Sequence, residues 1–187
     1  MDDQIKLIVG LGNPGKKYEH SRHNLGFLTI DAFLEKKPDL HWQKKWDGEF
    51  VRMNIGDTER IFLKPQTFMN LSGHSVQAFL QFYKLQPHQM IVIHDEADLE
   101  EGDVRLKKGG GAGGHNGLLS IFEQTGLQEF LRLRVGVGKD TNKELADFLL
   151  EKTSKNKLLD LSQKASQTLE AVFEHGFVKA QNQLNKK

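Results

Sequence analysis

Residues 5–26 read IKLIVGLGNPGKKYEHSRHNLG and decide how the rest of the chain folds. The apolar run at the start of this stretch ends abruptly in glycine and proline, which is typical of a buried strand that enters a tight loop. The segment that follows carries Leu25, Leu28 and Ala32 at helical spacing and predicts a helix. A strand, a polar loop and a helix in this order favour an open α/β sheet, in which ligands bind beyond the carboxyl ends of the strands.

The loop between this strand and this helix collects polar side chains, namely Asn13, Tyr18, His20, His23 and Asn24. A single histidine is ordinarily packed or solvated. His23 differs because it shares its loop with Asn13 and Tyr18 at the edge of the sheet where ligands bind. We therefore expect His23 to be a catalytic residue.

A nucleotide site is the alternative interpretation of the same loop. Gly10, Gly12 and Gly15 have the GxGxxG spacing of a dinucleotide-binding turn. However, Pro14 has no amide donor, and the helix begins too late for its amino terminus to face a pyrophosphate. The spacing therefore favours a structural turn.

Length and composition predict one globular domain over residues 1–187. The chain has 187 residues, of which 27% are charged, and shows neither a linker nor an internal repeat. It has no cysteine, which excludes disulfides, thiolate nucleophiles and cysteine-ligated zinc. Asp2, Asp3 and the shortness of the first apolar run argue against a signal peptide or a membrane span, so we expect a cytoplasmic protein.

The charge distribution indicates a modest basic face. The net charge is only +1, but residues 103–143 contain seven Lys or Arg against four acidic residues, a local charge of +3. Such a face is typical of contact with nucleic acid, although a solvated surface explains it equally well.

The middle of the chain predicts a hairpin and then a second helix. Residues 49–55 and 59–63 flank a Gly-Asp turn, which predicts two paired strands, whereas 38–48 has no regular pattern. Ser72 can cap a helix over the following apolar positions. Asn70 then lies in the loop that enters this helix, as a turn former or as a substrate ligand.

Residues 90–93 form a continuous apolar run, the pattern of a strand covered on both faces. His94, Asp95 and Glu96 follow directly. Carboxylates at the end of a central strand can reach the loop of the first strand, so we expect Asp95 to pair with His23 and to fix its tautomer. The alternative is that Asp95 caps a turn.

Six glycines lie between residues 109 and 117, before Asn116 and another predicted helix. The predicted strand over residues 130–137 places Arg132 and Arg134 on one face, as solvent-facing residues or phosphate contacts. The chain from residue 142 onward reads as helical, with an end at His175 and Gly176.

Five segments carry a resemblance to a known family. In chain order they are GLGNPGKKYEHSRHNLG, FLKPQTFMNLSG, HDEADLEEG, GGGAGGHNG and LRLRVGVG. Their order and spacing resemble those of bacterial peptidyl-tRNA hydrolase. The resemblance implies a single α/β domain with a twisted mixed β-sheet flanked by helices, and a monomer. It also implies hydrolysis of the ester that joins a peptide to the terminal ribose of tRNA.

The resemblance also implies roles for individual residues. It implies that His23 is the catalytic base, that Asp95 orients it, and that Asn13 acts beside them. The implied substrate-binding residues are Tyr18, Phe68, Met69, Asn70 and Asn116. The implied tRNA-binding residues are Arg105, Lys107, His115 and Arg134.

Neither a metal nor a cofactor is expected, because a water activated by a neutral imidazole suffices for an ester. Two other functions remain as alternatives. A non-catalytic RNA-binding relative would not need the pair of His23 and Asp95. A metal-dependent hydrolase would use His20, His23, His94 and Asp95, but the chain lacks an HExxH or comparable pattern.

Overall fold

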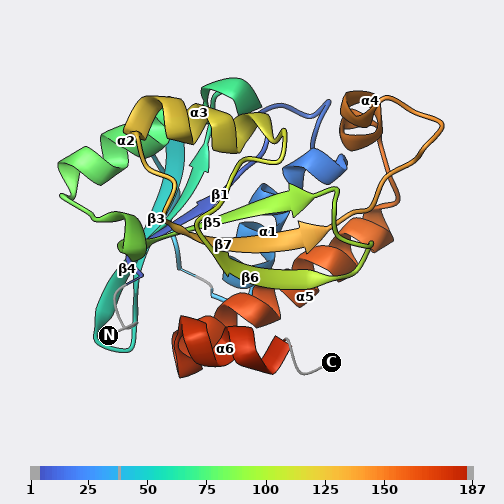
Figure 1. The fold of residues 1–187 in the computed structure, drawn as a ribbon. Helices are drawn as coiled ribbons and strands as arrows, with labels where there is room; N and C mark the ends of the chain where they lie inside the picture. Colours follow the sequence, from blue (N-terminus) through green and yellow to red (C-terminus); the bar gives the residue numbers. More distant parts are fainter. Residues whose placement is uncertain (1–4, 38, 185–187) are drawn as a thin grey trace.

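Seven strands form one mixed sheet in the computed structural model, which describes residues 5–37 and 39–184 (Figure 1). The strands are β1 (Leu7–Gly10), β2 (Gln43–Lys45), β3 (Gly48–Ile55), β4 (Thr58–Pro65), β5 (Met90–Glu96), β6 (Val104–Lys108) and β7 (Leu131–Gly136). The α-helices are α1 (Leu25–Leu34), α2 (Ser72–Phe82), α3 (Asn116–Thr125), α4 (Leu145–Leu150), α5 (Lys155–His175) and α6 (Phe177–Leu184). Three 3₁₀ turns are η1 (Arg22–Asn24), η2 (Met69–Leu71) and η3 (Pro87–Gln89).

The strand order is β2-β3-β4-β1-β5-β7-β6. The four central strands β4, β1, β5 and β7 run parallel to one another, and the outer pairs are antiparallel. The loops that follow the parallel strands therefore emerge at one edge of the sheet. This confirms the α/β class expected from the first strand and helix.

Helices cover both faces of the sheet. Figure 1 shows α2 and α3 above the sheet and α5 and α6 below it. One apolar cluster joins the sheet to α1, α5 and α6, and the other joins it to α2 and α3. Every residue of β1 is buried, because this strand lies at the centre of the sheet with helices on both sides.

Close packing explains the glycines of the opening segment. A Cβ atom on Gly10 would lie 2.3 Å from the carbonyl oxygen of Gly26 in α1, and one on Gly12 would lie 2.6 Å from the Phe27 ring. A Cβ on Gly26 would in turn lie 2.2 Å from the backbone nitrogen of Leu11. These glycines let β1 and α1 approach each other closely. Close packing therefore explains the glycines at positions 10 and 12 without a nucleotide-binding site.

The hairpin of β3 and β4 confirms the prediction from the Gly-Asp turn. The irregular conformation predicted for 38–48 is wrong in part, because Gln43–Lys45 forms β2 against β3. Trp46 and Asp47 make this turn with φ angles of 49° and 52°. Positive φ at both turn positions is the geometry of a two-residue hairpin, but neither residue is the Asn or Gly that usually signals it.

Two local predictions are also wrong. Ser72 does not cap α2: it is the first residue of the helix and is fully buried, with its hydroxyl 4.0 Å from Met69 Sδ. η2 leads into α2 instead. Likewise β5 continues through Glu96, because the backbone of β7 pairs with it as far as Gly136.

The carboxyl-terminal third is helical, as predicted, but it contains three separate helices. Ser154 Oγ accepts a hydrogen bond from the backbone N–H of Lys157 and caps α5, and α5 ends at His175, with Gly176 at a φ of 84°. Within the described part of the chain, no helix has the length and apolar character to cross a membrane. Asp2 and Asp3, on which part of the signal-peptide argument rests, lie outside it.

Candidate active site

The parallel arrangement of β1, β4 and β5 brings three polar segments to one edge of the sheet. Asn13 follows β1, Met69 follows β4, and Asp95 lies near the carboxyl end of β5. η1 adds His23 from the turn just before α1, and the residue before α3 adds His115. Sheet topology thus gathers residues that are as much as 102 positions apart in the sequence.

His23 and Asp95 form a buried pair, as the sequence predicted. His23 Nδ1 lies 2.9 Å from Asp95 Oδ2 and 3.0 Å from Oδ1. His23 is 7% exposed and Asp95 is 2% exposed. The alternative in which Asp95 caps a turn is excluded by its position inside β5.

His115 is the second partner of Asp95, with its Nε2 3.0 Å from Asp95 Oδ1. Its Nδ1 accepts a hydrogen bond of 3.1 Å from the backbone N–H of Gly117, in the first turn of α3. A neutral imidazole that accepts at Nδ1 carries its proton on Nε2, so His115 donates to Asp95. No pattern in the sequence predicts this contact. With both ring nitrogens engaged inside the protein, His115 is badly placed to meet a tRNA phosphate.

The two imidazoles stabilise the ionised form of Asp95. Burial alone would raise the pKa of this carboxyl, but the electrostatic interactions with His23 and His115 and the hydrogen bonds from both rings lower it well below its usual range. The ionised carboxylate accepts only, so His23 donates its Nδ1–H. When His23 is neutral, its Nε2 therefore presents a lone pair.

The pKa of His23 itself reflects two opposed effects. Burial lowers it, whereas the charge of Asp95 and the hydrogen bond to it raise it, and the net shift is upward from 6.5. His94 behaves differently: burial and the neighbouring His115 lower its pKa to about 3. His94 is thus neutral across the physiological range, with its Nδ1 2.7 Å from the Asp95 carbonyl oxygen.

Asn13 is held by two elements. Its side-chain Oδ1 accepts from the backbone N–H of Met69 at 2.7 Å, while Asn24 clamps its backbone by accepting from its N–H and donating to its carbonyl. Because its Oδ1 is occupied, the Asn13 side chain has its NH₂ group left to donate. Asn24, adjacent to His23, thus holds the backbone of Asn13, a contact that the sequence did not predict.

A crevice of about 240 Å³ opens above the pair. Its lining includes His23, Asp95, His115 and Asn116. An apolar part of the lining comes from α4, which contributes Leu145, Ala146, Leu149 and Leu150. Sequence reasoning gave this helix no role, because a short apolar segment carries no sign of what it faces.

Four of the five predicted substrate ligands are outside the lining of the crevice. Phe68 is 57% exposed and Asn70 is exposed in η2, while Tyr18 is partly buried in the loop after β1. Met69, the fourth, is buried, and its backbone N–H donates to Asn13 Oδ1. The structure therefore brings Asn116 to the crevice and leaves the other four outside its lining.

Basic residues gather on the two strands beyond β5. Arg105 on β6 is directly opposite Arg134 on β7, and Arg134 is opposite His94 on β5, one residue before Asp95. Arg134 Nε donates to Glu96 Oε2 at 3.0 Å, and Arg105 pairs with Asp103 at 3.3 Å. These pairs leave the remaining N–H groups of each guanidinium for an anion.

The sequence predicted Arg132 as a solvent-facing residue or a phosphate contact, but the structure places it in the interior. It is 3% exposed, and its guanidinium donates to the carbonyls of Gly110 and Gly111. It is therefore not a solvent-facing residue, and its guanidinium binds the protein backbone. Arg132 instead holds the glycine-rich segment 109–117 in place through these hydrogen bonds, and this segment carries His115 and Asn116.

The metal site considered above does not assemble. His20 is partly exposed beside Glu19, and His94 Nδ1 faces the Asp95 backbone. Among the described residues, the metal-ligand types that converge are His23, Asp95 and His115. The capping bond from Gly117 places the proton of His115 on the nitrogen that would have to bind a metal, so this geometry favours a proton network.

A family model described as peptidyl-tRNA hydrolase matches residues 7–187, nearly the whole chain. This chain belongs to the peptidyl-tRNA hydrolase family. The resemblance drawn from the five sequence motifs is therefore confirmed.

Relatives in this family match along most of their length. The peptidyl-tRNA hydrolase of Haemophilus influenzae (strain PittGG) is 44% identical over 188 residues, with 97% of each chain covered. That of Dichelobacter nodosus is 43% identical over 170 residues, with 90% of each covered. The crystal structure of peptidyl-tRNA hydrolase from Acinetobacter baumannii superposes with a TM-score of 0.88 at 37% identity, covering 99% of this chain and 96% of that one.

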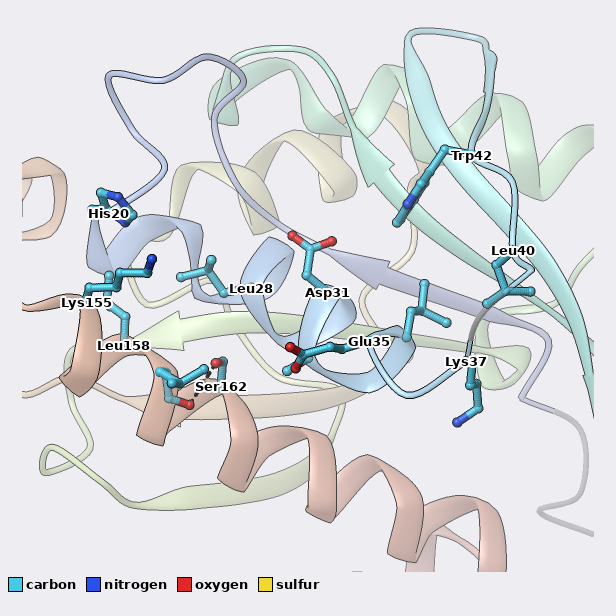
Figure 2. Close-up of a pocket in the computed structure, with 13 residues that line it drawn as sticks. His20, Leu28, Asp31, Glu35, Lys37, Leu40, Trp42, Lys155, Leu158 and Ser162 are labelled. Carbon is cyan, nitrogen blue, oxygen red and sulfur yellow. Dashed lines mark hydrogen bonds between the residues drawn. The ribbon is translucent and has the colours of Figure 1, made fainter.

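This member of the peptidyl-tRNA hydrolase family also has a larger cavity, of about 450 Å³, away from the crevice. Figure 2 shows it between α1 and α5, with Asp31 and Glu35 on one side and Leu158 on the other. Of the site residues considered from the sequence, it is lined only by His20, which belonged to the metal-site alternative. We place the active site in the smaller crevice, because that is where buried ionisable groups with shifted pKa values converge.

Proposed function

We propose that this chain hydrolyses the ester bond between a peptide and the terminal ribose of tRNA, with His23 as general base. The observation that carries the proposal is the buried pair of His23 and Asp95, which faces a crevice in a chain of this family. The reaction returns tRNA that has left the ribosome prematurely with a peptide attached.

The first step is attack by water. His23 Nε2 accepts a proton from a water molecule in the crevice, and the resulting hydroxide attacks the ester carbonyl. Asp95 holds the Nδ1–H of His23 and stabilises the imidazolium that forms. The proton then passes to the ribose oxygen as the ester bond breaks, which releases a free peptide and tRNA.

Amide groups suit the remaining tasks, because they donate hydrogen bonds without a charge that would shift the pKa of His23. We assign Asn13, with its NH₂ group left to donate, to the attacking water or the developing oxyanion. Asn116 lines the crevice and is assigned to the peptide. Tyr18, Phe68, Met69 and Asn70 are assigned to the approaches that the substrate crosses.

The tRNA backbone is assigned to the basic face. Arg105 and Arg134 lie on one face of neighbouring strands, next to the strand that carries Asp95. Lys107 is exposed and lies opposite Arg132 on the same face. Phosphate contacts of this kind read shape and charge, so the enzyme need not depend on tRNA sequence.

His115 receives a different role from the tRNA contact implied by the resemblance. Its Nε2–H and the Nδ1–H of His23 both donate to Asp95, and α3 fixes its tautomer through Gly117. We propose that His115 is a positioning residue that keeps Asp95 ionised and oriented.

We further propose that the chain acts as a monomer in the cytoplasm. One chain supplies every residue assigned to the crevice, and peptidyl-tRNA arises at the ribosome. Sedimentation at micromolar concentration checks the first point, and a dimer that must form for turnover would contradict it.

The direct test is release of N-acetylated amino acids from tRNA by the purified protein. We expect turnover that is unchanged by 1,10-phenanthroline, with Mg²⁺ present to keep the tRNA folded, because the proposed base is an imidazole. Loss of turnover that Zn²⁺ restores would indicate a metal-dependent hydrolase instead. Binding of tRNA without any turnover would indicate a non-catalytic RNA-binding protein.

Arg134→Met tests the basic face. We expect KM to rise about tenfold with kcat nearly unchanged, and the slope of log K against log salt to fall by about 1, since one phosphate contact is lost. Filter binding of tRNA over a salt series measures the slope. Arg52→Met is the matched control, because Arg52 lies on the hairpin strand β3 and pairs with Glu59 on β4. An unchanged slope in Arg134→Met would contradict the assignment.

A further inference from the structure

Arg22 immediately precedes the proposed base but takes no part in the steps above. It is 8% exposed, and its NH1 donates to the Phe148 carbonyl oxygen and to Glu151 Oε1, both at 3.0 Å. Its guanidinium carbon lies 3.9 Å from the centre of the Phe148 ring. Arg22 therefore contacts the helix that walls the crevice.

That helix, α4, has only six residues. A helix of this length is not stable by itself, so contacts with the rest of the fold must hold it in place. α4 packs against η1, and the segment before His23 also pairs with the chain just beyond α4. Ser21 forms an isolated β-bridge with Lys152, and the Thr153 N–H donates to the His20 carbonyl at 2.9 Å.

The two faces of α4 have different surroundings. Phe148 is buried in the core, whereas Leu145 and Leu150 are 39% and 38% exposed and line the crevice with His23 and Asp95. Leu149 is buried and also lines the crevice. The exposed leucines thus form an apolar surface that lines the same crevice as the base. Whatever fixes α4 also fixes the distance between this surface and His23.

Burial of the Arg22 guanidinium costs desolvation free energy, which is unfavourable if the side chain only fills space. Its Nε is buried and finds no partner among the described residues. The charged groups around it are Glu151 and Lys143, and Lys143 itself binds Glu151 at 2.7 Å. An apolar side chain would avoid the desolvation, so the hydrogen bonds to α4 are what the arginine specifically supplies.

We propose that Arg22 is a positioning residue that ties the α4 wall to the segment carrying the base, and that the wall packs against an apolar side chain next to the scissile ester. This rests on the proposed function. The proposal also predicts substrate specificity. An α4 wall held at a fixed distance from His23 favours substrates with a large apolar residue next to the scissile ester.

The test compares Arg22→Met with the parent in two measurements. Hydrogen exchange should show about tenfold faster exchange at Leu145–Leu150 amides, with β5 and α1 amides unchanged, because only the anchor is lost. In the hydrolysis assay, kcat/KM for N-acetyl-leucyl-tRNA should fall about tenfold, whereas kcat/KM for N-acetyl-glycyl-tRNA should fall by less than about threefold. Both acyl groups are carried by the same tRNA sequence, so that only the amino acid differs. The acid limb of the pH profile should not move.

Arg60→Met is the matched control. Arg60 is a 5% exposed arginine that donates to the carbonyls of Ile55 and Thr58 and lies over the Phe173 ring, away from the crevice. We expect it to lower the melting temperature but to leave α4 exchange and the leucyl-to-glycyl ratio unchanged. If Arg22→Met does not fold, Glu151→Ala removes one partner of Arg22 at a half-exposed site and should shift both measurements in the same direction.

Two outcomes overturn the inference. Unchanged α4 exchange would show that Arg22 does not anchor the helix, and equal losses on both substrates would show that the wall does not contact the side chain. A parent protein that hydrolyses neither substrate would instead contradict the proposed function. The exchange measurement would still decide whether Arg22 holds α4.

Discussion

His23→Ala should lower kcat for N-acetylated aminoacyl-tRNA by about 10²- to 10⁴-fold, the range that positioned general bases contribute. The structure gives the reason. His23 contacts Asp95 through Nδ1 and lines the crevice. His94 is buried with a pKa of about 3, and the Nε2 of His115 already donates to Asp95. Neither neighbour can take over the role. Single-turnover kinetics measure the chemical step, and filter binding should show tRNA affinity within about twofold of the parent.

His20→Ala is the control for this substitution. His20 is three residues earlier, 40% exposed at its side chain and paired only with Glu19 among the described residues. We expect normal turnover from this variant. Turnover near the parent level in His23→Ala would mean that another group activates the water, and equal losses in both variants would point to disruption of the loop.

Asp95→Asn should lower kcat by about 10³- to 10⁴-fold through the tautomer of His23, as in other carboxylate–histidine pairs. His115 Nε2–H donates to Oδ1, so the new amide keeps its oxygen on that side and directs its NH₂ group at His23 Nδ1. His23 then has to accept at Nδ1 and carry its proton on Nε2, which faces the crevice. A ring in that state cannot accept a proton from water.

The same variant should change the pH profile. In the parent, the net shift raises the pKa of His23 above 6.5, so kcat/KM should rise with pH through a midpoint above 6.5 as the ring loses its proton. Asp95→Asn removes the charge responsible for the upward shift, so the midpoint of the residual activity should move to lower pH. Stopped assays between pH 5 and pH 9 measure both curves.

Asp98→Asn provides the control, because Asp98 is exposed in the same motif and pairs with Lys139 at 2.5 Å. We expect its rate and midpoint to match those of the parent. An Asp95→Asn enzyme with the midpoint of the parent would show that Asp95 does not set the protonation of His23. The orienting role would then have to be withdrawn.

The sequence by itself determined the class of fold and the family. An apolar run that ends in glycines, a helical repeat after it and a Gly-Asp turn between two strands are local patterns, and local sterics and burial decide them. The pairing of His23 with Asp95 was also accessible, because residues at the ends of neighbouring parallel strands meet at one edge of the sheet.

Only the tertiary structure decided which partners these residues have. Nothing in the glycine-rich segment indicates that His115 turns toward Asp95, or that Arg132 is buried against the carbonyls of Gly110 and Gly111. The same holds for β2, for the last residues of β5 and for the α4 wall tied to Arg22. Periodicity states which face a side chain occupies, whereas the partner it meets there depends on contacts between distant segments, which form only when the whole chain packs.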